Sequence, residues 1–185
     1  MTTFTFPELQ TENLDLVEPK MSHASDIADY MKDGRVQKHL PNIPDSYTEK
    51  NAKEYITTKK DAMGPKNLVF WSLHHKQDNK IIGLANIHSI DTGNRNGELG
   101  YGLNPDYWGR GLMKEALQSV ITYGFNRHNL YRVEAKTAER NTNSKNLLES
   151  LGFTKEGTLR DHMEIRGERV DNAVYSMLKP EWNHE

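Results

Sequence analysis

Hydrophobic and polar positions along the chain follow two periods, and these predict an alternation of strands and helices. Apolar residues alternate with polar ones where a strand is expected, and they recur every three or four positions where a helix is expected. Apolar-rich runs, several of them alternating with polar residues, predict strands over residues 14–17, 68–74, 80–90, 98–103 and 131–137, and on both sides of the turn Arg166-Gly167-Glu168. The helical pattern predicts helices that end at about Lys32, at Gly64-Pro65, near Gly124 and at Gly152.

The starts of the first two helices are predicted from capping residues. Ser22 or Ser25 is the expected N-cap of the first helix, and Ser46 or Thr48 that of the second. Residues 34–47 between the two helices are expected to form a loop. These patterns alone lead as far as a mixed sheet flanked by helices.

The segment from Leu103 to Met113 joins a predicted strand to a predicted helix and is rich in glycine and charge. Pro105 cannot donate a hydrogen bond to a neighbouring strand, so the strand is expected to end before it. Gly109 and Gly111 then stand where the next helix begins. The first amides of a helix lack internal partners and carry partial positive charge, so this segment is predicted to bind a phosphate or pyrophosphate.

Two common phosphate-binding patterns do not fit this segment. A Walker loop requires Gly-Lys-Ser/Thr, but Gly111 is followed by Leu-Met-Lys, with no hydroxyl to hold magnesium. The dinucleotide fingerprint requires a third glycine where Lys114 stands, and Glu134, the candidate for its acidic residue, lies inside an alternating strand. Nucleotide hydrolysis and hydride transfer are therefore disfavoured.

Composition narrows the class of protein further. The 24 lysines and arginines are balanced by 26 aspartates and glutamates, so no basic excess is available for nucleic acid. The chain has no cysteine, which excludes a disulfide framework and a cysteine nucleophile. His74 and His75 are adjacent in a strand and would point to opposite faces, so no metal site is expected. No signal peptide or membrane-spanning apolar stretch is seen. We expect one domain over residues 1–185, in the cytoplasm, with neither membrane nor nucleic acid as partner.

Two sequence blocks resemble a known family. Trp108-Gly109-Arg110-Gly111-Leu112-Met113 resembles the acetyl-coenzyme A loop of the GNAT superfamily, written Gln/Arg-x-x-Gly-x-Gly/Ala. Its departures from that form, together with Tyr107 before it and Glu115-Ala116 after it, are similar to the RimJ/RimL-type N-terminal acetyltransferases. Residues 141–153 resemble the Asn-x-x-Ser-x-x-x-Leu-Glu-x-x-Gly-Phe helix of the same branch, and the resemblance extends over about residues 14–182.

The resemblance implies a GNAT fold of the α+β, mixed α/β class. This fold is a twisted, mostly antiparallel sheet of about seven strands flanked by about four helices. The strand of Glu98 and that of Tyr131 are expected to splay apart, with the pantetheine arm between them. Acetyl-coenzyme A is the implied cosubstrate, with no metal. The residues expected to bind it are Leu103, Trp108, Gly109, Arg110, Gly111, Leu112, Met113, Asn141 and Ser144.

Two side chains are expected to carry the chemistry. Glu98 is the expected base, acting directly or through water, because residues of a strand beside the cofactor alternate between core and cleft; the alternative is a solvent-facing edge residue. Ser144 matches the serine that faces the sulfur in RimL-like enzymes, and its alternative role is a helix cap. Leu148 stands where many GNAT enzymes have a tyrosine acid, and Met163 where the RimL type has a glutamate. The pair Asp161-His162 is a further acid-base candidate.

The favoured function is acetyl transfer to a protein N-terminal α-amine, of ribosomal-protein type, by direct attack in a ternary complex. An α-amino group is about a tenth neutral at pH 7, whereas a lysine is neutral below about 0.1%, so the α-amine needs less help from a base. The alternatives are acetylation of a small amine such as a polyamine, an amino acid or an antibiotic, and a catalytically weak domain that binds coenzyme A and a partner. A homodimer is included among the expected partners.

Overall fold

The computed structural model describes residues 5–41, 43–64 and 68–183, and within them eight strands form one sheet. The strand order is β1-β2-β3-β4-β5-β6-β8-β7, and all neighbouring strands are antiparallel except the parallel pair β5 and β6. The strands are β1 (Leu9–Gln10), β2 (Leu14–Val17), β3 (Leu68–His75), β4 (Lys80–Asp91), β5 (Asn96–Leu103), β6 (Arg132–Ala138), β7 (Thr154–Ile165) and β8 (Glu168–Leu178). The two-residue β1 is the strand that the sequence patterns did not predict.

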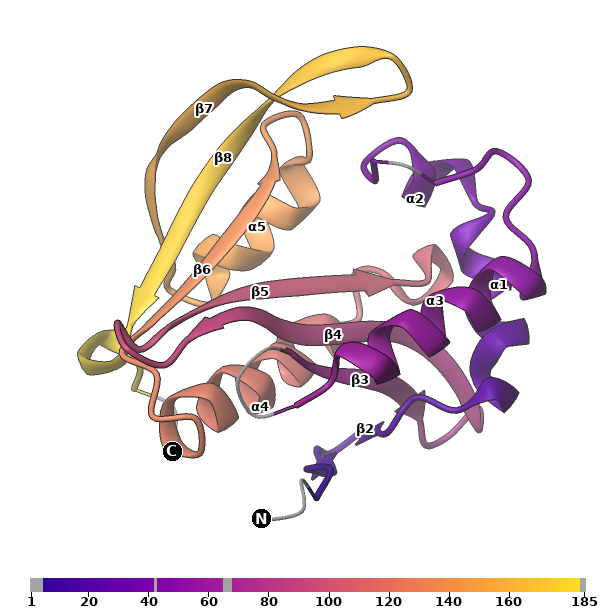
Figure 1. The fold of residues 1–185 in the computed structure, drawn as a ribbon, viewed down its shortest axis with the longest axis horizontal. Coiled ribbons are helices and arrows are strands. Elements are labelled where there is room, and N and C mark those ends of the chain that lie inside the picture. The colour runs from indigo at the N-terminus through magenta and orange to yellow at the C-terminus, as the bar shows by residue number, and fades with distance from the viewer. Residues whose placement is uncertain (1–4, 42, 65–67, 184–185) are drawn as a thin grey trace.

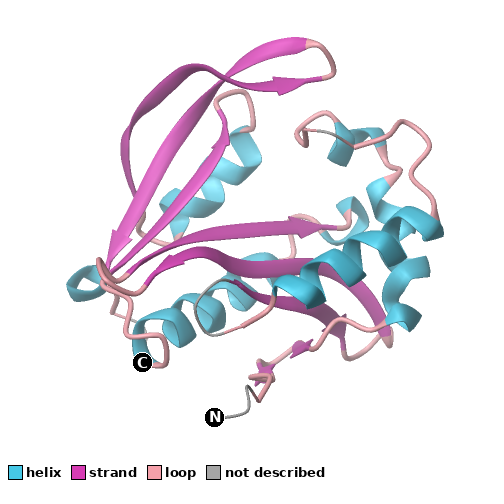
Figure 2. Ribbon diagram, in the orientation of Figure 1, coloured by secondary structure: helices cyan, strands magenta, loops and turns pink. Residues whose placement is uncertain are grey.

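Helices cover both faces of this sheet (Figures 1 and 2). They are α1 (Ala24–Met31), α2 (Gly34–Gln37), α3 (Glu49–Ala62), α4 (Leu112–Asn126) and α5 (Thr142–Ser150). Trp71, on β3, lies in the core that α4 covers, while its neighbour Phe70 lies in a second core under α1 and α3. Both side chains are fully buried. Because β3 is covered on both sides, it reads as a continuous apolar run rather than an alternating one.

The predicted splay between β5 and β6 is present and lies near the middle of the sheet (Figure 1). The two strands pair at three positions only, of which Glu98 with Glu134 is the last. From Leu99 onward β5 stays paired with β4 on one edge and loses its partner on the other. A V-shaped opening in the hydrogen-bonding pattern therefore begins directly after Glu98.

Several predicted boundaries are corrected by the structure. His23 is the N-cap residue of the first helix, and its side chain makes no capping hydrogen bond. A turn of 3-10 helix (Met21–His23) leads directly into this helix, so neither Ser22 nor Ser25 caps it. Residues 34–47 are not all loop, since Asp33 accepts the amide hydrogen bond that starts the short helix α2. Thr48 is the N-cap of α3, which ends at Ala62. Pro65, half of the predicted stop signal, lies outside the described residues.

Candidate active site

Gly109 and Gly111 form the turn that leads from the end of β5 into α4. Their φ angles are 74° and 77°, a left-handed conformation that glycine adopts without a steric penalty. Gly111 is the N-cap of α4, and no side chain caps this helix. No atom lies within 4 Å of the place where a Cβ on either glycine would stand. The first amides of this 15-residue helix thus have no side-chain cap, which leaves them available to an anion.

The neighbouring side chains hold this turn in place. The Trp108 indole nitrogen donates to the backbone oxygen of Leu103 at 2.9 Å, which ties the turn to the end of β5. The Arg110 guanidinium donates to the backbone oxygen of Asp106 at 2.8 Å and lies over the Tyr107 ring, 4.9 Å from its centroid. The side chains of the predicted loop residues are therefore largely occupied within the protein, and its free groups are backbone amides.

Two predicted cofactor residues, Leu112 and Met113, are buried in the core beneath α4. Their side chains anchor the first turn of the helix. His75 supports the same turn from β3: its ring packs edge-on against Tyr107 with centroids 5.3 Å apart. The Tyr107 hydroxyl donates to Asp78 at 2.6 Å. His74, in contrast, contacts Asn79 at 2.9 Å, so the two adjacent histidines serve different contacts.

Asn141 and Ser144 lie at the start of α5, on the α4 side of the sheet. The Asn141 side chain accepts the backbone amide of Ser144 at 3.3 Å and so caps α5. The Ser144 hydroxyl instead contacts the Tyr101 hydroxyl of β5 at 2.8 Å. Burial raises the pKa of Tyr101, so its hydroxyl keeps its proton at neutral pH. Leu148, at the position of the absent tyrosine acid, is fully buried.

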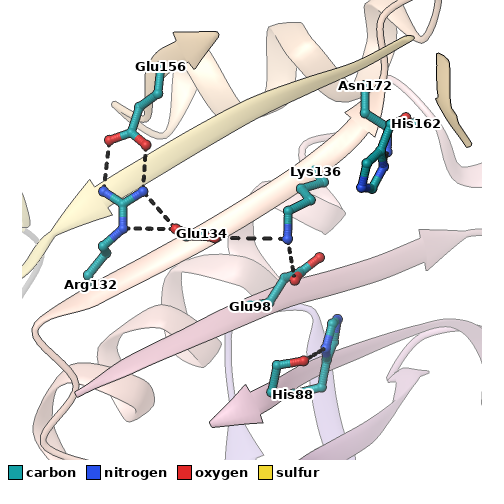
Figure 3. A network of polar contacts seen from close by, with 9 residues as sticks. His88, Glu98, Arg132, Glu134, Lys136, Glu156, His162 and Asn172 are labelled. Atoms are coloured by element: carbon teal, nitrogen blue, oxygen red, sulfur yellow. Dashed lines mark hydrogen bonds and ion pairs between the residues drawn. The ribbon is translucent and has the colours of Figure 1, made fainter. Parts of the chain in front are cut away.

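Glu98 lies on the opposite face, in a network of charged side chains at the point where β5 and β6 diverge (Figure 3). Its carboxylate accepts a hydrogen bond from Lys136 of β6 at 2.7 Å, and Glu134 lies 3.9 Å from the same ammonium group. Arg132 joins Glu134 to Glu156 of β7, with contacts of 2.8 Å and 2.5 Å. These contacts hold the pKa of Glu156 at about 2, Arg132 being the main cause. Glu98 is therefore one member of a group of linked ion pairs on this face of the sheet, and its side chain is only about a quarter exposed.

His88 of β4 stands directly across from Glu98 in the sheet and lies beside it in Figure 3. The strand bulges immediately after it: Ser89 and Ile90 oppose the single residue Gly97 of β5. Ser89 has a φ of 51°, and its hydroxyl lies 2.9 Å from the Nδ1 of His88. Burial lowers the pKa of His88 below 6.5, Lys59 and Lys136 lower it further, and Glu98 acts in the opposite direction. The ring is therefore mainly neutral at pH 7.

The remaining candidates lie on the hairpin of β7 and β8. The Nδ1 of His162 lies 3.3 Å from the side-chain amide of Asn172, and both appear on the same side as Lys136 in Figure 3. The backbone amide of Asp161 donates to Asp171 at 2.8 Å. Met163 packs in a small cluster with Ala138, Ile165 and Val170. Asp161 and His162 therefore make separate contacts, Asp161 through its backbone amide and His162 through its ring.

The predicted catalytic residues border the splay from opposite faces of the sheet. Glu98 and Tyr101 are three residues apart on one strand, so their side chains point to opposite sides. Ser144 joins the Tyr101 side and Lys136 the Glu98 side. Sequence reasoning missed Tyr101, Lys136 and His88 as members of the site. Strand alternation was a signal for each of them, but only the register shows which face and which neighbour each one has.

Comparison with known proteins decides the family. The model of the acetyltransferase (GNAT) domain matches residues 13–154. The chain belongs to the GNAT acetyltransferase family. This GNAT acetyltransferase is 36% identical over 174 residues to the uncharacterized N-acetyltransferase p20 of Bacillus licheniformis, covering 94% of this chain and 97% of the relative. It is 32% identical over 114 residues to the ribosomal protein uS5-alanine N-acetyltransferase of Escherichia coli, covering 61% and 59%.

Solved structures confirm the predicted mixed α/β GNAT fold. The ribosomal-protein-S5-alanine acetyltransferase of Vibrio fischeri superposes with a TM-score of 0.83 at 26% identity, covering 96% of this chain and 99% of that chain. RimL, the ribosomal L7/L12 acetyltransferase, in complex with coenzyme A gives 0.84 at 18% identity, covering 93% and 98%. The microcin C7 self-immunity acetyltransferase MccE, in complex with acetyl-coenzyme A and AMP, gives 0.81 at 20%, covering 90% and 93%. The last two similarities show the shared fold.

The residues of this GNAT enzyme fit acetyl-coenzyme A, the donor that the family uses. The uncapped start of α4, with open space at both glycines, offers amide donors for the pyrophosphate. The free edge of β5 beyond Glu98 offers backbone groups to an amide-bearing arm. Among the described residues, no cluster of three or more metal-ligating side chains occurs, and every helix is too short or too polar to span a bilayer.

Proposed function

We propose that this N-acetyltransferase acetylates the α-amino group of a protein N-terminus, with a ribosomal protein as the favoured substrate. The observation that carries the proposal is the near full-length similarity to the Vibrio fischeri ribosomal-protein-S5-alanine acetyltransferase, which covers 96% of this chain. The similarity to the uS5-alanine enzyme of Escherichia coli supports the same substrate class. Because ribosomal proteins are synthesised in the cytoplasm, the proposal places the enzyme there.

The chemistry of the site supports an acceptor that is easily deprotonated. A free α-amine loses its proton near pH 8, whereas lysine requires a pH near 10.4, a difference of about 3 kcal/mol at neutral pH. Acetyl transfer from a thioester to an amine needs no covalent protein intermediate, so the proposed reaction is direct attack of the amine on the donor in a ternary complex. Acetyl-coenzyme A, when bound, supplies the activated acetyl group. The protein's own residues then have to place the amine, receive one proton and solvate the leaving sulfur.

We assign these roles to the two faces of the splay. On one face, the paired hydroxyls of Ser144 and Tyr101 can donate a hydrogen bond to a departing thiolate. On the other, the carboxylate of Glu98, fixed by Lys136, accepts a hydrogen bond from the incoming amine and orients it. The backbone from Trp108 to Met113 holds the pyrophosphate, and Asn141 fixes the start of α5 beside the pantetheine path.

The test is a panel of acceptors offered to the purified enzyme with acetyl-coenzyme A, with acetylated products identified by mass spectrometry. Two peptides form the matched pair: one has a free α-amine and no lysine, and the other has a blocked N-terminus and one lysine. We expect acetylation of the first to be at least ten times faster. Calorimetry measures acetyl-coenzyme A binding in parallel.

Other results would assign another function. Preferred acetylation of spermidine, a free amino acid or an aminoglycoside would contradict the proposal and favour the small-amine alternative. Binding of acetyl-coenzyme A with no product on any amine would favour a domain that binds coenzyme A and a partner without turnover.

A further inference from the structure

We propose that His88 is the general base of the acetyl transfer and takes the proton that the acceptor amine loses. The inference rests on acetyl transfer to an amine and holds for any amine that the acceptor panel selects. It gives Glu98, the base expected from the sequence, an orienting role. Three geometric observations carry it: the position of His88 at the splay, the bulge that aims its ring, and the pairing that occupies Glu98.

The position of His88 places it at the splay of the sheet. His88 is paired with Glu98, and Glu98 is in turn paired with Glu134 at the last position where β5 and β6 are joined. Cross-strand partners point to the same face of a sheet, so His88 and Glu98 share the face opposite Tyr101. Figure 3 shows the two side chains on neighbouring strands of this face. A group that contacts Glu98 on this face would therefore have His88 on the neighbouring strand, across β5 from the splay.

The bulge after His88 orients the His88 ring. A bulge bends one strand and redirects side chains, and bulges occur often beside active sites. Here Ser89 adopts a φ of 51°, an uncommon conformation for a residue other than glycine, asparagine or aspartate. In that conformation its hydroxyl lies 2.9 Å from Nδ1 of His88. In the tautomer that acts as a base, Nδ1–H donates to the Ser89 hydroxyl oxygen, and Nε2 keeps the free lone pair that accepts a proton.

The surrounding charges favour His88 over Glu98 as the proton acceptor. Glu98 already accepts a hydrogen bond from the Lys136 ammonium group at 2.7 Å, so its carboxylate is engaged before an amine arrives. An imidazole titrates closer to neutral pH and is the better acceptor in its neutral form. The charged groups that act on His88 are Glu98 of β5, Lys136 of β6 and Lys59 of α3. Burial is the main cause that lowers the pKa of His88, the two lysines lower it further, and Glu98 opposes them.

Atoms and protons balance in the proposed reaction without any further reactant. The amine nitrogen forms the new bond to the acetyl carbon and loses one proton to Nε2 of His88, directly or through one water. The carbon–sulfur bond breaks, and the sulfur leaves as a thiolate that accepts a hydrogen bond from Ser144. The thiolate takes a proton from solvent, and His88 returns one proton to solvent. The products are the N-acetyl amine and free coenzyme A.

The first test measures the ring of His88 without turnover. The histidine ring carbon resonances of the free enzyme are titrated by NMR, and the signal of His88 is identified by its loss in His88→Gln. We expect a midpoint below 6.5. Glu98→Gln should lower the midpoint further, because a favourable charge is removed, and Lys136→Met should raise it. A midpoint above 7 would mean a ring that is charged at neutral pH and would overturn the proposal.

The second test uses activity on the best acceptor of the panel. His88→Gln should lower kcat about a hundredfold, with the affinity for acetyl-coenzyme A unchanged. Free imidazole should restore part of the activity to His88→Ala. A peptide hydrazide, whose nucleophile stays neutral over the pH range, isolates the enzyme's own titration: kcat should fall as the pH drops through the pKa of His88 in the wild type and stay flat in His88→Gln.

Two other histidines complete the design. His74→Gln is the matched control, because His74 lies on β3 and contacts Asn79 away from the splay, and its kcat should equal that of the wild type. His162→Gln tests the rival histidine on the same face. The assignment would be refuted if His88→Gln kept a kcat within twofold of the wild type. It would also be refuted if His162→Gln, and not His88→Gln, abolished the fall of kcat at low pH. If the best acceptor is a small amine, the proposed substrate class fails while the His88 results keep their meaning.

Discussion

The proposed donor side and the proposed acceptor side of this active site are built from different parts of the polypeptide. The donor side uses the main chain: Gly109, Gly111 and the uncapped start of α4 form one continuous segment. The acceptor side uses side chains that converge from separate strands, with His88 from β4, Glu98 from β5 and Lys136 from β6. A backbone site depends on local conformation, whereas a side-chain site depends on sheet register.

This difference explains how each side can tolerate change. The backbone amides of the donor side are the same for any sequence that adopts the turn, so the side chains around it serve to hold the turn, as Trp108 does. On the acceptor side, each charged group changes the titration of its neighbours. Substitutions that disrupt the donor-side turn should abolish acetyl-coenzyme A binding. Substitutions on the acceptor side should instead change kcat and the choice of acceptor by smaller factors.

The largest effect is expected for Gly111→Asp. An aspartate there must adopt a φ of 77°, and its negative charge stands at the start of α4, where the phosphates should bind. Acetyl-coenzyme A binding should fall more than a hundredfold in calorimetry. Gly167→Asp is the matched control, because Gly167 has a φ of 79° and equally open space but lies in the β7–β8 turn. If Gly167→Asp weakens binding as much as Gly111→Asp, the effect is on folding and not on the site.

Ser144→Ala should lower kcat about tenfold and change the affinity for acetyl-coenzyme A less than twofold. The hydroxyl is expected to contact the sulfur only when negative charge develops there, and a hydrogen bond to a charged group contributes about 1.5 kcal/mol or more. Tyr101→Phe should have a smaller effect in the same direction, since it removes the partner of Ser144. Normal turnover in Ser144→Ala would show that the leaving group needs no help from this residue.

Lys136→Met is expected to lower the KM of a cationic acceptor about threefold. Its ammonium group lies 2.7 Å from Glu98 and repels an incoming ammonium ion on the same face. Steady-state kinetics with the free α-amine peptide measures the change. The hydrazide peptide, which carries no charge there, should show little change in KM. An equal change for both acceptors would contradict the electrostatic explanation.

The turn at Gly109 and Gly111 and the helix after it could be predicted from the sequence because their signal is contiguous. Glycines, a strand end and a helical pattern within one short segment define the turn, and its phosphate-binding role stays a prediction. Ser144 lies in a second contiguous block. The helix and strand types were also predictable, since they follow from periodicity. The splay itself was implied by resemblance, and the structure confirms it in the three pairings of β5 with β6.

The acceptor side could not be predicted in the same way because register is not local. Strand alternation could place His88 and Glu98 on one face of their strands, but their pairing depends on the bulge at Ser89 and Ile90. One extra residue in a strand reverses the facing of everything beyond it. The helix start near Ser22 was missed for a related reason: a turn of 3-10 helix satisfies the backbone without a side-chain cap.

The smallest effect tests whether Ser89 is kept for its contact with His88 in spite of its strained backbone. Three residues are compared at this position. Ser89→Ala removes the hydroxyl and keeps the strain, and Ser89→Gly removes both. At a φ of 51° the Ser89→Gly variant should have a free energy of unfolding about 1 kcal/mol higher than that of Ser89→Ala, measured by chemical denaturation.

The same two variants separate stability from catalysis. Because both lose the hydrogen bond between residue 89 and Nδ1 of His88, both should lower kcat by the same factor, about threefold. Recovery of kcat in the more stable glycine variant would mean that the bulge matters only for folding. Equal loss in both would mean that the serine hydroxyl orients the His88 ring, and that the acceptor side trades some stability for that orientation.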